Sequence, residues 1–301
     1  MMLRRLAALP VLLALTLLAP AEGLPAPKAA DCELLAAAAV WPGDVGSLAP
    51  CPGIGPGSAL VLRIGPYSWL PAQVEEAYCS MAFVVTDGTD LYVATAGHCV
   101  EDSLGVPSLG ERVSAHGVPG TFGTVAYQWC EGQAANGGCA AGTDFGLIRI
   151  DADKRSYVHA EMCRWGKASG VYTATSGSGF VQHYGWGLVL GSSTHLGANK
   201  DDVHVMPGNP ATQARQGLLV DPTFTASSAL IETAGISGDS GSGVLATSQI
   251  VVPGLTAPEA KALGVFTHVS VGGIGIVQRL DVSLAKAGAD MGKTFTLVTE
   301  L

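Results

Sequence analysis

Charged residues are scarce in this sequence: they make up 14% of the 301 residues, and positive charge is the scarcer sign. Lys and Arg number 16 against 25 Asp and Glu, which gives a formal net charge of −9. Such a chain lacks the basic excess that attracts phosphate backbones, so we expect no nucleic-acid partner. Low charge, 40 glycines and scattered short apolar runs favour an all-β protein with many turns.

Long apolar runs are also absent, because no stretch reaches the roughly 18 residues that a membrane-spanning helix requires. The apolar run Leu6–Leu18 follows Arg4 and Arg5 and precedes the small residues Ala19-Pro20-Ala21. This is the pattern of a secretory signal peptide over residues 1–21. We therefore expect a secreted, extracellular protein with no membrane contact after signal removal. No Asn-x-Ser/Thr glycosylation site occurs.

Seven cysteines, an odd number, leave at least one thiol that is free or pairs between chains. Export makes disulfides the expected state of the others. Cys130 and Cys139 bracket a glycine-rich loop, and their closeness predicts a local disulfide.

Residues 22–69 contain seven prolines and seven glycines with little apolar alternation. This composition predicts either a short pro-segment or an arm wrapped over the fold, and both alternatives stay open. From Cys79 onward the pattern changes to strands and turns, with a polar connection around 151–161. We expect one β-barrel over 70–160, and a second barrel with a terminal helix over 161–301.

The predicted strands are short and apolar or β-branched, and Asp87-Gly88-Thr89-Asp90 between two of them predicts a hairpin turn. They are 81–86, 91–95, 112–116, 121–127, 144–150, 170–175, 179–184, 218–220, 243–246, 262–269 and 275–278. Residues 280–288 have helical spacing.

The stretch with the clearest chemistry is Gly235–Val244, in which Ser240 lies among glycines before an apolar strand. Such a turn exposes the hydroxyl and directs the backbone amides of Gly238 and Ser240 toward one point. A serine needs a base and an orienting group to act as a nucleophile. His98, in Thr-Ala-Gly-His-Cys, and Asp144, before an apolar strand, are the candidates.

These three stretches resemble the chymotrypsin-like serine peptidases, in that family's order of His, Asp and Ser. The resemblance covers about residues 79–277. It implies two six-stranded antiparallel β-barrels packed together, with the active site between them and a short C-terminal helix. It also implies a disulfide between Cys79 and Cys99, which would pin the loop that carries His98.

The resemblance implies a serine endopeptidase acting on proteins or peptides, without cofactor or metal. Ser240 would attack the scissile carbonyl and His98 would accept its proton. Asp144 would orient His98, and the Gly238 and Ser240 amides would bind the oxyanion. We expect a monomer.

Two other readings compete with an active peptidase. A catalytically silent relative would use the same fold to bind proteins or surfaces. A Gly-x-Ser-x-Gly nucleophile elbow fails, because Ser242 stands at its fifth position and the acid and histidine are out of order. The Asp201–His204 stretch is read as a solvated loop rather than a cation site, and the remaining histidines, His268 included, are scattered.

A finer resemblance links Cys163-Arg164 to bacterial secreted members such as the α-lytic protease and streptogrisin group. It implies that Arg164 forms an ion pair with Asp239, the residue before the nucleophile. Their usual partner cysteine is absent, so Cys163 pairs with Cys32 or Cys51, if it pairs at all. No Ile-Val-Gly-Gly activation segment occurs.

The family's specificity pocket maps onto two stretches. Ala234 would stand at the pocket base, where trypsin-like members carry aspartate, and Ser237 lies nearby. Phe266, Thr267 and Val269 would line the wall, and Val269 would narrow the entrance. A pocket without an acid cannot compensate the desolvation of Lys or Arg, so we expect cleavage after uncharged small-to-medium residues, although His268 leaves room for acidic substrates.

Overall fold

The structure is a computed structural model. It describes residues 53–63, 76–101, 108–115, 117–132, 139–162, 165–185, 214–233, 235, 238–249, 259–269 and 274–301. Several predictions therefore lie outside the described residues. They concern the signal peptide, Cys32, Cys51, Cys163, Arg164, Asp201–His204, Ala234 and Ser237.

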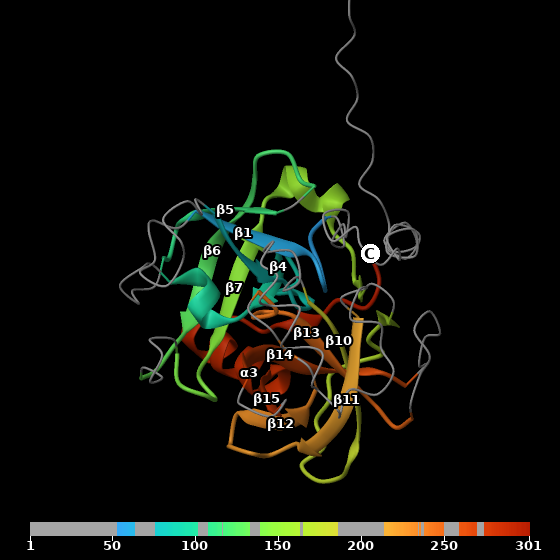
Figure 1. The fold of residues 1–301 in the computed structure, drawn as a ribbon. Coiled ribbons are helices and arrows are strands. Elements are labelled where there is room, and N and C mark those ends of the chain that lie inside the picture. Colours follow the sequence, from blue (N-terminus) through green and yellow to red (C-terminus); the bar gives the residue numbers. More distant parts are fainter. Residues whose placement is uncertain are drawn as a thin grey trace, which may run out of the picture.

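The first half of the chain forms one antiparallel sheet of eight strands, in the order β16-β3-β4-β7-β6-β5-β1-β2. Figure 1 labels β1, β4, β5, β6 and β7 of this sheet. Its strands are β1 (Ala59–Arg63), β2 (Glu76–Ser80), β3 (Val84–Thr86), β4 (Leu91–Thr95), β5 (Arg112–Ala115), β6 (Thr121–Trp129), β7 (Phe145–Ile150) and, from the C-terminus, β16 (Thr296–Leu297). The sheet is a half-barrel, because the outermost strands β16 and β2 do not pair with each other.

The second half is a closed barrel of six antiparallel strands, in the order β10-β11-β12-β15-β14-β13. These are β10 (Gly179–Tyr184), β11 (Ala214–Asp221), β12 (Ser228–Glu232), β13 (Gly243–Thr247), β14 (Lys261–Val269) and β15 (Ile274–Arg279). The helix α3 (Leu280–Met291) follows, and its end is marked by Gly292 at a φ of 65°. The predicted all-β, two-barrel fold with a short C-terminal helix is confirmed.

The described chain also has two short 3-10 helices, of which the first lies within the first half, and a small two-stranded ribbon. The 3-10 helix η2 (Gly97–Val100) follows β4, and η3 (Ala152–Tyr157) lies in the predicted polar connection. The strands β8 (Glu161–Met162) and β9 (Gly166–Lys167) pair only with each other. None of the helices in the described part of the chain has the length and hydropathy of a membrane span.

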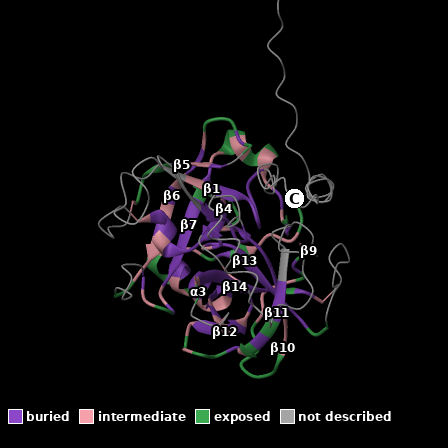
Figure 2. Cartoon of the chain, in the orientation of Figure 1, coloured by how far each residue is buried: buried purple, intermediate pink, exposed green. Residues whose placement is uncertain are grey.

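Apolar burial connects the two halves, and Figure 2 shows buried ribbon through the middle of both. One cluster of buried side chains fills the inside of the closed barrel. A larger cluster occupies the first sheet and continues to Leu245 and Val265 of the second half and Leu284 of α3. The two halves therefore share one continuous apolar contact, which fixes the loops at their junction.

The predicted elements correspond closely to the observed ones, with one wrong strand and several omissions. Residues 170–175 make a single bridge from Val171 to Ala262 rather than a strand. Only the second half of the predicted strand 81–86 forms a strand, which is β3. Residues 82 and 83 nevertheless exchange backbone hydrogen bonds with Ala94. The sequence did not predict six short strands, of which β1 lies in Pro- and Gly-rich sequence: β1, β2, β8, β9, β12 and β16.

Residues 53–63 are part of the fold. β1 lies between β2 and β5 in the sheet, and residues 53–60 are buried. Ile54 exchanges backbone hydrogen bonds with Tyr157 and His159, and the Ser58 hydroxyl bonds the His159 ring at 2.9 Å. Burial lowers the pKa of His159 to about 4, so this ring is neutral at pH 7.

Candidate active site

His98 lies on η2, directly after β4. Gly97 permits this tight turn, because a Cβ there would lie 2.9 Å from the Phe145 nitrogen and 3.0 Å from the Trp129 carbonyl oxygen. Cys99 forms a disulfide with Cys79 at the end of β2. Both predicted disulfides, Cys79–Cys99 and Cys130–Cys139, are present. The first one ties the histidine turn to the strand beside it.

Asp144 is placed beside His98 by strand pairing. It directly precedes β7, and β7 is antiparallel to β4 with Gly146 opposite Thr95. The end of β4 and the start of β7 therefore meet at the same edge. The Asp144 carboxylate is fully buried; Oδ2 lies 2.7 Å from His98 Nδ1, and Oδ1 accepts a 2.9 Å hydrogen bond from the His98 backbone amide.

Ser240 lies in a turn that glycines make possible. Gly238 and Gly241 have φ angles of 98° and 89°, in the left-handed region that favours glycine. The turn is closed by a hydrogen bond from the Ser242 amide to the Asp239 carbonyl, and the Gly241 amide bonds the Phe266 carbonyl on β14. Positions 238 and 241 of this turn therefore favour glycine over any other residue.

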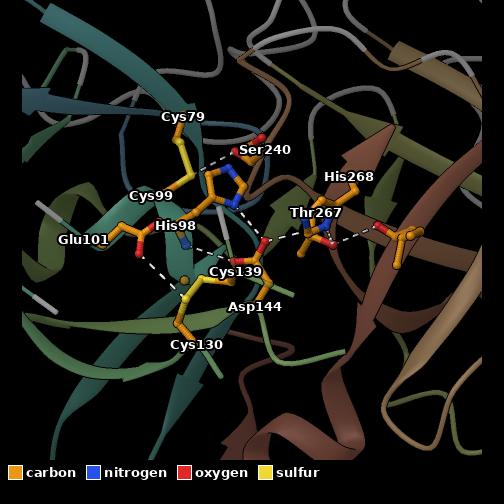
Figure 3. Close-up of polar contacts among 12 residues, drawn as sticks. Cys79, His98, Cys99, Glu101, Cys130, Cys139, Asp144, Ser240, Thr267 and His268 are labelled. Carbon is orange, nitrogen blue, oxygen red and sulfur yellow. Dashed lines mark hydrogen bonds and ion pairs between the residues drawn. A yellow bond between two sulfur atoms is a disulfide. The ribbon is translucent and has the colours of Figure 1, made fainter. Parts of the chain in front are cut away.

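The three predicted residues lie at the junction of the halves, where the Ser240 carbonyl oxygen is 3.7 Å from the Sγ of Cys99, the neighbour of His98. Figure 3 shows the His98 ring between Ser240 and Asp144. No hydrogen bond joins the side chains of His98 and Ser240, both of which are described residues. Bonds of this kind are often long before substrate binds.

The environment of His98 favours its protonated form. Burial acts to lower the pKa of His98, but the charge and hydrogen bond of Asp144, with a smaller contribution from Glu101, raise it above the ordinary value of 6.5. A base with a raised pKa holds a transferred proton well, which suits a group that takes a proton and later returns it.

A second histidine, His268, which the sequence analysis did not connect with Asp144, lies at this carboxylate. His268 Nδ1 is 3.7 Å from Asp144 Oδ2 and 3.0 Å from Thr267 Oγ1. The β14–β15 register shifts between Phe266 and His268, and such a bulge re-aims the side chains beyond it. Thr267 itself is buried and donates to the Ile276 carbonyl at 3.2 Å.

Among the predicted pocket residues, the structure describes Phe266, Thr267 and Val269. Val269 is exposed at the end of β14, with 47% of its surface accessible. Phe266 is 2% accessible, and its ring stacks on His183 with centroids 5.1 Å apart. A Cβ at Gly235 would lie 2.4 Å from the Phe266 ring and one at Gly275 2.6 Å, so this ring fills the space between the two glycines.

Two groups of potential metal ligands occur among the described residues, and neither suits an ion. One is Cys79, His98 and Cys99, and the other is Glu101, Cys130 and Cys139. All four cysteines are in disulfides, so they have no thiolate to offer.

Comparison with known proteins gives a family match. The model of the trypsin family matches residues 65–272. No curated protein sequence matches this chain at a significant level.

Comparison with solved structures returns several peptidases. Thermobifida fusca protease A is 20% identical, over 82% of this chain and 98% of its own, with a TM-score of 0.41. Cellulomonas bogoriensis chymotrypsin is 17% identical over 82% and 98%, with a TM-score of 0.40. A glutamic-acid-specific serine protease that uses a histidine triad in substrate binding is 17% identical over 74% and 94%, with a TM-score of 0.41.

Proposed function

Since the chain belongs to the trypsin family, whose members are serine endopeptidases, we propose that it cleaves proteins through a triad of Ser240, His98 and Asp144. The observation that carries the proposal is the 2.7 Å contact of His98 Nδ1 with the buried Asp144 carboxylate (Figure 3). The Sγ of Cys99, the neighbour of His98, lies 3.7 Å from the Ser240 carbonyl oxygen, so the serine turn adjoins the histidine turn. In this arrangement Asp144 holds the Nδ1–H tautomer and leaves Nε2 to accept a proton.

The proposed reaction has two halves. In the first, a bond forms between Ser240 Oγ and the scissile carbonyl carbon while His98 Nε2 takes the hydroxyl proton. The C–N bond then breaks, and the leaving amine receives that proton. In the second, a water oxygen bonds the acyl carbonyl carbon while His98 Nε2 takes a water proton; the ester C–O bond to Ser240 Oγ then breaks, Oγ receives that proton, and the carboxylic acid product leaves. The amides of Gly238 and Ser240 are the proposed donors to the oxyanion, and losing one such donor costs about 3–4 kcal/mol.

Labelling with a fluorophosphonate tests the nucleophile directly. We expect the reagent to modify Ser240 alone, located by peptide mass spectrometry, and Ser240→Ala to abolish the adduct. Ser242→Ala is the matched control, because Ser242 lies two residues away and is fully buried. His98→Ala should slow labelling by several orders of magnitude, because the hydroxyl loses its base.

The outcome also decides between the two functional classes. A folded protein that leaves the reagent untouched, while a control serine peptidase reacts, would be the catalytically silent binding relative. Modification at a different serine would contradict the proposed triad but would still indicate an active serine enzyme.

The packing of Phe266 supports a preference for small uncharged residues before the cut. Its ring occupies space between Gly235, five residues before Ser240, and Gly275 on β15. By the family resemblance this is where a substrate side chain would enter. A filled pocket favours Ala or Gly over larger side chains by excluded volume. Casein digestion with mapping of the cut sites checks this, and cleavage mainly after Lys, Arg or Glu would contradict it.

Secretion is the last part of the proposal, with residues 1–21 as the signal peptide. The two disulfides support an oxidising compartment. Because β1 pairs with both β2 and β5, any further processing should spare residues 53–63. The intact mass of the protein secreted by an expression host should therefore place its N-terminus between residues 22 and 53. A mature N-terminus after Arg63 would contradict this.

A further inference from the structure

Ser80 is the last residue of β2 and is completely buried beside the Ser240 turn. Its neighbour Cys79 forms the disulfide with Cys99, the residue after His98. Ser80 is therefore attached covalently, over a few bonds, to the segment that carries the proposed base.

Two hydrogen bonds run from Ser80 to the turn of the other half. Its backbone amide donates to the Ser240 carbonyl at 2.7 Å, and its hydroxyl donates to the Gly238 carbonyl at 2.9 Å. The contact is close on the main-chain side as well. A Cβ at Gly241 would lie 2.1 Å from the Ser80 carbonyl oxygen, which itself accepts a 3.0 Å bond from Thr95 Oγ1.

We propose that the Ser80 hydroxyl is a positioning group for the oxyanion hole. The Gly238 carbonyl belongs to the peptide that joins Gly238 to Asp239, between the two proposed amide donors. Gly238 has a φ of 98°, and a glycine can leave that conformation at little cost. A bond that holds its carbonyl fixes the rotation of this peptide, and with it the directions of the Gly238 and Ser240 amides.

The two hydrogen bonds divide this role. The backbone bond to Ser240 would form with any residue but proline at position 80, so it anchors the turn in general. The hydroxyl bond depends on serine, and a buried carbonyl left without its donor costs free energy. The Ser80 hydroxyl thus orients the peptide between Gly238 and Asp239, which the backbone bond alone does not do. This inference rests on the proposed function, because the oxyanion is the intermediate of that reaction.

Ser80→Ala removes only the hydroxyl and keeps the backbone bond. We expect kcat toward a peptide amide to fall about 10-fold with KM changed less than twofold, because the bond acts on the transition state. The inhibition constant of a peptidyl aldehyde, whose adduct carries the oxyanion, should rise by a similar factor. Ser283→Ala is the matched control. Ser283 is a buried serine of α3, and its hydroxyl accepts a 2.9 Å hydrogen bond from the side chain of Gln278. The substitution should lower the melting temperature without changing kcat.

Amide hydrogen exchange of residues 238–241 gives a readout that needs no catalysis. Exchange there should speed up in Ser80→Ala and stay unchanged in Ser283→Ala. If Ser80→Ala keeps wild-type kcat, aldehyde affinity and exchange, the positioning role is wrong while the peptidase stands. If the wild type itself shows no turnover or labelling, the proposed function fails, and the exchange comparison alone decides whether the hydroxyl holds the turn.

Discussion

His268 Nδ1 lies 3.7 Å from Asp144 Oδ2, the same oxygen that His98 Nδ1 contacts at 2.7 Å. The two rings are 6.1 Å apart between centroids, so the carboxylate has an imidazole on two sides. Burial lowers the pKa of His268 below 6.5, the nearby His98 lowers it further, and the Asp144 charge opposes both. At neutral pH His268 is therefore uncharged and does not compete with His98 for the charge of the Asp144 carboxylate.

We predict an acid limb of kcat/KM with two ionisations. As pH falls, His98 is protonated first, because its pKa is raised above 6.5, and the base is lost. His268 follows at lower pH, and its charge then competes for Asp144 Oδ2. The slope of log kcat/KM against pH should steepen from one toward two in the wild type and stay at one in His268→Asn. Circular dichroism at each pH excludes unfolding, and a wild-type slope of one throughout would contradict the prediction.

Phe266→Ala should widen substrate preference. Removing the ring frees the space between Gly235 and Gly275. The ratio of kcat/KM for a substrate with Leu or Phe before the cut to kcat/KM for a substrate with Ala there should therefore rise about 10-fold. The truncation should also cost about 3–5 kcal/mol of stability. Phe122→Ala, at a fully buried position in β6, is the control that loses comparable stability without a change in preference.

Gly235→Ala gives a second check on the same packing. Its Cβ would lie 2.4 Å from the Phe266 ring, so it should destabilise the wild type and be tolerated when Phe266 is Ala. Additive effects of the two changes would show that this ring does not occupy the space beside Gly235.

Asp239 is a buried carboxylate packed against the main chain, since a Cβ at Gly185 would lie 2.2 Å from its Oδ1. A buried charge needs a compensating one, and the sequence offers Arg164, which is not among the described residues. Arg164→Met should therefore cut turnover sharply. Adding Asp239→Asn to that variant should recover part of the lost stability, which thermal melting would detect. Wild-type turnover in Arg164→Met would refute this pairing.

Lys293 joins the C-terminal segment to the first hairpin. Its ammonium pairs with Asp87, bonds Tyr92 Oη at 2.6 Å and lies 5.2 Å from the Tyr92 ring centre. The hydrogen bond from Lys293 is the largest cause that holds the pKa of Asp87 well below its usual range. Asp87 thus contributes stability above the ordinary carboxyl pKa, and this is lost as pH falls through the lower folded-state value.

We expect Lys293→Met to destabilise the protein by about 1 kcal/mol at pH 7, a modest value because the lysine is a third exposed. The difference from wild type should shrink below about pH 4, where Asp87 becomes protonated without its partner. Lys286→Met is the control, because Lys286 pairs with Asp290 one helical turn away on the surface of α3. Urea titrations at several pH values measure both variants.

Local patterns in the sequence determined much of this protein. The strands at 179–184 and 275–278, the Asp87–Asp90 turn and the helix from Leu280 are all seen in the structure, because each depends on neighbouring residues. The proposed triad of His98, Asp144 and Ser240 was predicted from three short motifs, each carried by adjacent residues. The strand predicted at 170–175 was wrong because a strand needs a partner, and among the described residues this segment forms a single bridge, from Val171 to Ala262.

Only the tertiary structure decided the contacts that refine the site. Ser80 reaches Gly238 across 158 residues, His268 reaches Asp144 from the other half of the chain, and Phe266 fits between two glycines. It also placed 59–63 inside the sheet, where composition left an arm and a pro-segment equally open. Such contacts depend on strand register, on a bulge in β14 and on how the halves pack, and no local periodicity encodes these relations.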